Sequence, residues 1–380
     1  MYRKAAKATV DLDDASAASE RLEQKKQVDA FFRKWFGDRE RGSPSAASWS
    51  FADPTQFEEM LEDHLRALVA RRVDSAGATE AGAAVRLRGS PYRGLLSFDL
   101  QDTALFFGRT RARNQLREVL ARRIEGGQAF VLVFGASCSG KSSLVKAGLL
   151  ADLAVPGMMG QLALVRHGVL RPSDRSGHPI EALAAAMIQG TALPELTHAP
   201  FDYTIASLTA LLRQAPSHAV APIRQALGQA GRAADLAAAG EARLVVIVDQ
   251  LEELFTQEDL PVSEREVFVA ALEALATSGL LWVVATMRSD FFDRLETLPA
   301  LVSLSAGEGR YLLPPPDEME IGQIIRQPAR EARLRFEIDP ERALGLDDVI
   351  LQATGRATGA LPLLSFLLDQ YGGVALPKAY

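Results

Sequence analysis

The chain has 380 residues, which is more than one compact domain normally needs and suggests two or three structural units. Hydrophobic residues make up 48% of it and charged residues 24%, which excludes extensive disorder, collagen-like repeats and a continuous coiled coil. The net charge of −6 excludes a nucleic-acid partner held by overall positive charge.

The single cysteine, Cys138, excludes an internal disulfide and a zinc site built from cysteines. The five histidines are scattered and lack the spacing of a metal-binding pair. The N-terminus has no apolar stretch typical of a signal peptide, and the longest apolar runs, such as 280–287, are too short to cross a bilayer. We therefore expect a soluble, cytoplasmic protein with no membrane partner.

The first 73 residues are polar and are expected to be helical. Apolar residues recur at helical spacing over 28–36 and again over 57–69, where Asp53-Pro54-Thr55 provides a helix start signal. A loop over 42–50 separates the two patterns. Two such helices cannot form a core alone, so this segment must pack on another domain. Residues 74–89, rich in Gly, Ala and Arg, predict a linker.

Short apolar runs alternate with helical stretches from residue 90 to residue 313. Strands are predicted at 129–134, 162–166, 244–248 and 280–286. This alternation predicts an α/β fold with a mainly parallel sheet covered on both faces. Three prolines at 314–316 end the pattern, and only helix signals follow, at 318–326, 340–354 and 361–370. We expect a small helical subdomain over 314–380.

An eight-residue motif between the first predicted strand and a helix predicted over 142–150 matches G-x-x-x-x-G-K-[ST]. Its residues are Gly135, Ala136, Ser137, Cys138, Ser139, Gly140, Lys141 and Ser142. The glycines let backbone N–H groups surround a phosphate, and a helix N-terminus adds partial positive charge. Lys141 would reach the β- and γ-phosphates, and Ser142 would offer its hydroxyl to Mg²⁺. A chance Gly/Ser turn is the alternative, and the flanking strand and helix disfavour it.

A second magnesium anchor is predicted at Asp249, which follows a buried apolar strand. Its carboxylate would bind the ion through water, and either Glu252 or Glu253 would activate the attacking water. The alternative is an aspartate that merely ends a strand, with both glutamates on a solvated helix. Asp249 lies 108 residues after Lys141 with a strand between, a spacing typical of AAA-like ATPases. Small GTPases and nucleoside kinases are usually more compact.

A third strand end carries Arg288, whose guanidinium could sense the γ-phosphate. The alternative is a surface ion pair with Asp290 or Asp293. Cys138 occupies a variable position of the phosphate loop, and we interpret it as a bystander and not as a redox switch.

Several motifs in this order resemble the STAND NTPases, and within them the group called novel STAND NTPase 1. The resemblance spans about 90–371 and rests on the segments 91–95, 106–109, 135–149, 249–255, 288–291 and 359–364. It implies an ATP-dependent molecular switch with Mg²⁺ and slow hydrolysis, in which Ser143 also belongs to the nucleotide-binding loop. It further implies that Phe107, Gly108 and Arg109 cover the adenine, and that Pro362 contacts the base and couples nucleotide state to domain position.

The first 73 residues resemble the end of a TIR-like effector domain, whose catalytic part would lie upstream of Met1. The family resemblance also implies a sensor region, self-association, and a role in prokaryotic stress or defence signalling. Two other functions stay open on the residues alone. One is an ordinary turnover enzyme, such as an AAA-like motor or a small-molecule kinase. The other is a scaffold that binds ATP without hydrolysing it.

Overall fold

A computed structural model describes ten ranges of the chain. They are residues 2–4, 26, 49–51, 90–155, 157–160, 162–175, 177–234, 242–339, 344–354 and 361–372. The chain divides into two compact units, Met1–Arg86 and Leu87–Tyr380. No helix within the ten ranges is both long and apolar enough to span a bilayer.

The first unit contains two short strands that pair in parallel, β1 (Tyr2–Lys4) and β2 (Trp49–Phe51), with Arg3 opposite Ser50. The prediction of a wholly helical segment with a loop through residue 50 is therefore wrong at these positions. Three-residue strands are too short to reveal an alternating pattern in the sequence. The helices predicted over 28–36 and 57–69 and the linker over 74–89 lie outside the described residues.

The second unit is built on a five-stranded, all-parallel sheet with the strand order β4-β5-β6-β3-β7. The strands are β3 (Phe130–Gly135), β4 (Leu164–Leu170), β5 (Ala242–Val248), β6 (Leu281–Arg288) and β7 (Arg310–Leu312). The three central strands are continuous apolar runs because both faces of the sheet are buried. The predicted α/β class with a parallel sheet is confirmed.

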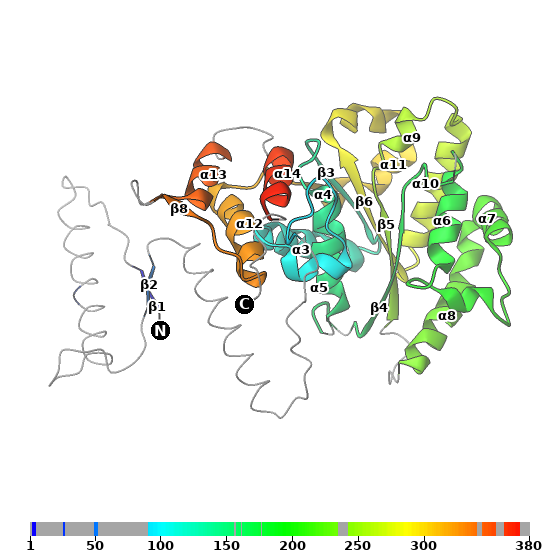
Figure 1. The fold of residues 1–380 in the computed structure, drawn as a ribbon. Helices are drawn as coiled ribbons and strands as arrows, with labels where there is room; N and C mark the ends of the chain where they lie inside the picture. Colours follow the sequence, from blue (N-terminus) through cyan, green and yellow to red (C-terminus); the bar gives the residue numbers. More distant parts are fainter. Residues whose placement is uncertain are drawn as a thin grey trace. The chain divides into compact units, whose positions relative to one another are not determined.

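Helices cover both faces of this sheet (Figure 1). One face carries α3 (Thr110–Glu125), α4 (Lys141–Ser143) and α5 (Leu150–Ala154). The other carries α6 (Pro179–Ile188), α7 (Ile205–Gln214), α8 (Val220–Ala233), α9 (Glu253–Thr256), α10 (Val262–Ala276) and α11 (Pro299–Leu304). Neighbouring side chains of a strand enter opposite cores: Leu244 belongs to the cluster that includes residues of α6 and α10, and Val245 to the cluster that includes residues of α3 and α5. Segments of 3₁₀-helix fill several connections: 100–105, 194–197, 216–219, 289–297 and 307–309.

Two features of the sheet differ from the sequence-based prediction. β4 extends to Leu170, four residues beyond the predicted end, which fell at residue 166 because His167 and Gly168 interrupt the apolar pattern before Val169 and Leu170. Gly168 lies in this stretch, and a Cβ there would lie 2.4 Å from the carbonyl oxygen of Ala186, so α6 approaches the strand closely. The edge strand β7 was not predicted, because three residues carry no periodicity.

The helix predicted after the phosphate loop runs from Lys141 to Ala154, but its middle, Leu144–Leu149, is a π-helical turn. Such turns often lie at functional sites. Gly148 lies in this turn, where an added Cβ would meet Arg113 at 2.9 Å and Phe106 at 3.1 Å. The missing side chain of Gly148 therefore lets α3 and the segment before it pack directly on the helix of the phosphate loop.

A smaller helical subdomain follows the three prolines. It contains α12 (Glu318–Glu331), α13 (Leu346–Thr354) and α14 (Leu361–Gly372). The prediction of helices alone is wrong here, because β8 (Ile338–Asp339) and β9 (Leu344–Gly345) form a small antiparallel pair before α13. The subdomain has its own apolar cluster, which also includes Tyr92 from the start of the second unit.

We call residues 90–109 the strap, because this segment contacts both the helical subdomain and the sheet layer. At one end, the hydroxyl of Tyr92 donates a buried hydrogen bond to the carbonyl oxygen of Ile325 in α12, at 2.5 Å. Further along, the N–H of Phe98 donates to Oγ of Ser143, at 3.0 Å. The strap therefore links two parts of the unit that are far apart in the sequence.

Candidate functional site

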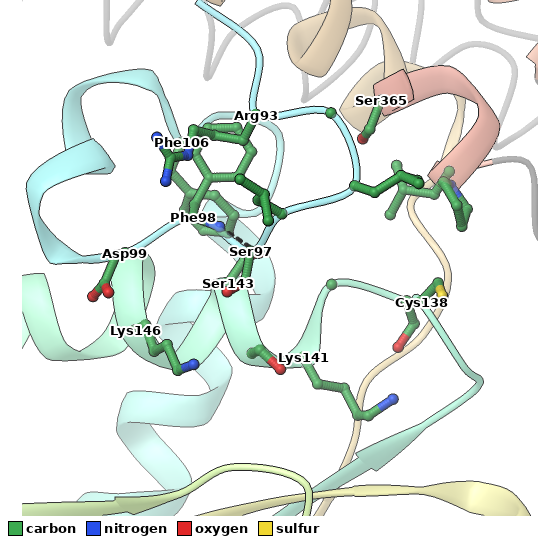
Figure 2. Close-up of a pocket in the computed structure, with 18 of the residues that line it drawn as sticks. Arg93, Ser97, Phe98, Asp99, Phe106, Cys138, Lys141, Ser143, Lys146 and Ser365 are labelled. Atoms are coloured by element: carbon green, nitrogen blue, oxygen red, sulfur yellow. Dashed lines mark hydrogen bonds between the residues drawn. The ribbon is translucent and has the colours of Figure 1, made fainter. Parts of the chain in front are cut away.

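A cavity of about 890 Å³ lies at the carboxyl ends of β3, β5 and β6, a size that suits a small-molecule ligand. The carboxyl edge of an open parallel sheet is the usual place for a ligand. Figure 2 shows the strap, with Phe98 and Phe106, on one side of the cavity and the phosphate loop, with Cys138 and Lys141, on the other. Ser365 of α14 lies at a third side.

Most of the residues predicted to form the site line this cavity. They are Phe107, Arg109, Ser137, Cys138, Ser139, Gly140, Lys141, Ser142, Ser143, Asp249, Glu252, Arg288 and Pro362. Four others do not line it: Gly108, Gly135, Ala136 and Glu253. The structure therefore brings together residues from three strand ends, the strap and α14.

The phosphate loop holds Lys141 across its own turn. Nζ of Lys141 donates to the carbonyl oxygens of Gly135, at 3.1 Å, and Ala136, at 2.7 Å. Burial lowers the pKa of Lys141, and the carboxylate of Glu252 counteracts part of this effect. Gly140 has a φ of 87°, a left-handed conformation that glycine adopts without strain. The loop therefore places a buried cation beside the first helical turn.

The carboxylate of Asp249 accepts three hydrogen bonds, each from a different helix or strand. Oδ1 accepts from the hydroxyls of Ser142, at 2.6 Å, and Thr286, at 2.7 Å. Oδ2 accepts from Nζ of Lys146, also at 2.6 Å. Burial acts to raise the pKa of Asp249, but the charge of Lys146 and these hydrogen bonds outweigh it and lower the pKa. Asp249 is therefore an ionised carboxylate with a fixed orientation.

The turn after Asp249 aims Glu252 into the cavity. Gln250 has a φ of 57°, and its N–H donates to Oγ1 of Thr286, at 3.0 Å, which holds this uncommon conformation in place. Glu252 is buried, and its Oε2 accepts the N–H of Arg288, at 3.2 Å. Burial raises the pKa of Glu252, and its bonds to backbone N–H groups offset only part of this rise.

Glu253 has a different environment from Glu252. Its Oε2 accepts the N–H of Ser173, at 3.0 Å, in an exposed contact outside the cavity. The structure thus separates two neighbouring glutamates that the sequence pattern could not distinguish.

Arg288 lines the cavity, but its guanidinium also forms an ion pair with Asp290, the alternative that the sequence left open. The guanidinium also lies 5.5 Å from the centre of the Phe291 ring. Nε of Arg288 is buried and has no hydrogen-bond acceptor among the described residues. A buried donor without a partner is uncommon in folded proteins.

Arg109 joins the phosphate loop to the helical subdomain. Its Nη2 donates to the carbonyl oxygen of Ser139, at 2.9 Å, and its Nη1 to that of Pro314, at 3.0 Å. The carboxylate of Glu320 in α12 lies 3.5 Å from Nη1. Burial lowers the pKa of Arg109, and Glu320 counteracts this effect. Next to it, Gly108 has a φ of 75°, and a Cβ there would lie 2.3 Å from the carbonyl oxygen of Glu320.

In a comparison of the sequence with known protein families, one family model matches the chain. The family model "Novel STAND NTPase 1" matches residues 91–371. The chain belongs to this family. The match begins after the N-terminal segment, and nothing supports the predicted likeness of that segment to a TIR-like domain. None of the curated proteins compared with the sequence matches it.

Three solved structures are similar to this STAND NTPase, each with 13% sequence identity. The Aeropyrum pernix ORC2 protein in ADPNP–ADP complexes has a TM-score of 0.40, with 71% of this chain and 69% of that chain covered. Cdc6p from Pyrobaculum aerophilum has a TM-score of 0.41, with 70% and 62% covered. C. elegans PCH-2 has a TM-score of 0.32, with 73% and 71% covered.

Several residues at the cavity of this STAND NTPase were not predicted as site residues. Lys146 follows Ser142 by four residues on the same helical stretch, and that spacing is a signal that could have identified it. Thr286 is a polar residue near the end of an apolar strand, a weaker signal. The strap residues Leu95 and Leu96 line the cavity and are 71% and 69% exposed. The other residues missed include Arg93, Phe98, Phe106, Arg171, Gln250, Leu361, Ser365 and Leu368.

The residues at the cavity fit a nucleotide with Mg²⁺. Oγ of Ser139 in the phosphate loop is buried and, within the described ranges, has no hydrogen-bond partner, like Nε of Arg288. A phosphate oxygen would satisfy both donors. The described residues contain no cluster of three or more His, Cys, Asp or Glu side chains that could hold a metal ion. The pair of Ser142 and Asp249 instead suits Mg²⁺, which keeps several waters and shares its coordination with substrate phosphates.

Proposed function

We propose that this STAND NTPase binds ATP with Mg²⁺ in the cavity, hydrolyses it slowly, and uses the nucleotide state to control conformation and self-association. One observation carries the proposal. Lys141 and Ser142 follow β3 and Asp249 follows β5, and all three line the same cavity, where Ser142 donates to Asp249. This is the arrangement that phosphoryl transfer needs, since its catalysis rests on positioning and charge.

Each residue of the cavity has a role in this proposal. Bound ATP supplies the γ-phosphoryl group, and Mg²⁺ neutralises the charge on its oxygens. Lys141 exchanges its two contacts with backbone carbonyls for contacts with phosphate oxygens. The exchange is favourable because phosphate oxygens carry more negative charge than carbonyl oxygens. Ser142 and Asp249 hold the metal, the carboxylate through water. Glu252 accepts a proton from the attacking water, and its raised pKa brings it closer to neutral pH, where a general base works best.

The strap and the helical subdomain supply the coupling in this proposal. Pro362 and Ser365 of α14 line the same cavity as the phosphate loop, so a bound base would contact both parts. We propose that residues 314–380 act as the moving subdomain and residues 90–313 as the core. The effector and sensor regions that the family resemblance implies would respond to this movement, in stress or defence signalling.

Nucleotide binding tests the proposal directly. Lys141→Ala removes a cation that would contact two phosphates, and each such bond contributes about 1.5–3 kcal/mol. Calorimetry with ATP and Mg²⁺ should therefore give strong binding to the wild type and at least a tenfold weaker affinity in the variant. Asp249→Asn should reduce magnesium-dependent hydrolysis far more than nucleotide binding without Mg²⁺. Equal ATP affinity in wild type and Lys141→Ala would contradict the proposal.

A scaffold that binds nucleotide without turnover is the second candidate. It is favoured by the partners of Asp249, whose oxygens already accept three hydrogen bonds and keep about one free acceptor position. The two functions differ in one measurement, the steady-state release of phosphate. A scaffold has no turnover for Glu252→Gln to remove, whereas the proposed ATPase loses its turnover in that variant.

A further inference from the structure

Lys146 is a buried cation that the proposed mechanism does not use. Its side chain is 9% exposed, and its Nζ lies 2.6 Å from Oδ2 of Asp249, 103 residues further along the chain. Buried lysines are rare unless they are paired. Figure 2 shows Lys146 below the strap, on the same helical stretch as Ser143 and Lys141.

The spacing along the helix explains how Lys146 reaches the aspartate. Ser142 and Lys146 are four residues apart and therefore lie on one face of the helical stretch. Asp249 faces both of them from the end of β5. The hydroxyl of Ser142 contacts Oδ1, and the ammonium group of Lys146 contacts Oδ2. The two oxygens of one carboxylate thus have different partners, one neutral and one charged.

The contacts leave the carboxylate little capacity to bind an ion directly. A carboxylate offers about four acceptor positions, two on each oxygen. The hydroxyls of Ser142 and Thr286 fill both positions on Oδ1, and Lys146 fills one on Oδ2. One position remains, which is enough for a metal-bound water.

The charges also balance before any ligand binds. Asp249 and Lys146 form a neutral pair, and their separation is far shorter than the screening length of physiological salt. A divalent cation that approaches Ser142 is attracted by the carboxylate and repelled by the ammonium group that is paired with it. The negative charge that would attract the ion must therefore come from elsewhere, and nucleotide phosphates carry it.

We propose that Lys146 is a positioning residue that makes magnesium binding at Ser142 and Asp249 conditional on bound nucleotide. It orients Asp249 and cancels its charge, so the empty site does not take up the free ion. This inference rests on the proposed nucleotide site. A structural ion pair with no influence on the metal is the competing explanation.

The decisive experiment titrates the nucleotide-free protein with Mg²⁺, and with Mn²⁺ as a spectroscopic probe, in the wild type, Lys146→Met and Lys146→Arg. We expect no saturable binding at millimolar concentration in the wild type or in Lys146→Arg, which keeps the charge. Lys146→Met should bind either ion at least about tenfold more tightly, because the carboxylate charge is no longer cancelled at a few ångströms. Equal ion affinity in folded wild type and Lys146→Met would overturn the proposal.

Two further variants keep the test decisive. Removing one member of a buried ion pair destabilises a fold, so Lys146→Gln, whose amide can still donate to Asp249, replaces Lys146→Met if the latter does not fold. The proposal predicts the same gain in ion affinity for it. Arg113→Met is the matched control, since it breaks another pair with an aspartate of the same helical stretch, Asp152. It should lower the melting temperature and leave ion binding unchanged.

The experiment separates this inference from the proposed function. ATP binding is measured in the same proteins with Mg²⁺ removed by a chelator. A wild type that binds no ATP overturns the nucleotide site, whatever the ion titration gives. A wild type that binds ATP, with ion affinities that do not depend on residue 146, overturns the role of Lys146 alone.

Discussion

Thr286 and Asp249 lie at the ends of neighbouring strands, and the hydroxyl of Thr286 donates to Oδ1 of Asp249 at 2.7 Å. The same Oγ1 accepts the N–H of Gln250, so one hydroxyl fixes both the carboxylate and the turn that follows it. Both side chains are almost completely buried. The orientation of the Asp249 side chain and of the turn that follows it therefore depends on β6, the neighbouring strand that carries Thr286.

Thr286→Val is expected to lower the free energy of unfolding by about 1–3 kcal/mol, because it leaves the N–H of Gln250 and one acceptor position of the buried Asp249 unsatisfied. Denaturant unfolding measures this loss. Thr277→Val, at an exposed threonine that bonds to the end of its own helix, is the control and should stay within about 0.5 kcal/mol of the wild type. Equal losses in the two variants would contradict the role of Thr286.

Glu252→Gln and Glu253→Gln form a matched pair of variants. Glu252→Gln should abolish most ATP turnover and leave ATP binding intact, because the amide occupies the same space but cannot accept a proton. Glu253→Gln should keep nearly full turnover, since its carboxylate bonds to Ser173 outside the cavity. Phosphate release and calorimetry measure the two properties. A greater loss of turnover in Glu253→Gln would reverse our assignment.

Glu252 should also make stability depend on pH. Its folded-state pKa is raised by burial, so its contribution to stability is fully present below the ordinary pKa of a glutamate and is lost as pH rises through the raised value. At neutral pH, Glu252→Gln should therefore melt at a higher temperature than the wild type, with the difference shrinking in acid. Melting curves of both proteins at a series of pH values test this. A difference in melting temperature that grows in acid would contradict a raised pKa of Glu252.

Arg109→Met is expected to loosen the contact between the phosphate loop and α12. The guanidinium makes two hydrogen bonds to backbone carbonyls, and each bond to a charged group contributes about 1.5–3 kcal/mol. Limited proteolysis should cut more readily near residues 314–316, and nucleotide affinity should fall. The control is Arg122→Met in α3, the helix that begins after Arg109, because the exposed pair of Arg122 with Glu308 contributes little. Equal cleavage rates in wild type and Arg109→Met would exclude this coupling.

The sequence was sufficient to predict the parts of the site that depend on local pattern. The phosphate loop has fixed residues at fixed spacing, and Asp249 follows a long apolar run, so both could be placed at strand ends of a parallel sheet. The central strands were also predictable, because burial on both faces makes them continuous apolar segments. The edge strands β4 and β7 were less predictable, since one is partly polar and the other has three residues.

Contacts between distant segments could not be predicted in this way. The spacing of Lys146 from Ser142 places the two on one helix face, but their contact with Asp249, and that of Thr286, arises only because the sheet brings three elements together. The choice between Glu252 and Glu253 depends on the backbone turn at Gln250, whose positive φ is unusual for that residue type. The contacts of Arg109 were not predictable from local pattern either, since its partners Ser139 and Pro314 lie 30 and 205 residues away.

The strap holds the helical subdomain at Tyr92 in two ways. The hydroxyl of Tyr92 donates to the carbonyl oxygen of Ile325, and its ring belongs to the apolar cluster of α12, α13 and α14. The N–H of Phe98 in the same segment donates to Ser143 on the helix of the phosphate loop. A substitution at Tyr92 therefore removes a polar and an apolar contact of the helical subdomain at once, while the contact of the strap with Ser143 stays in place.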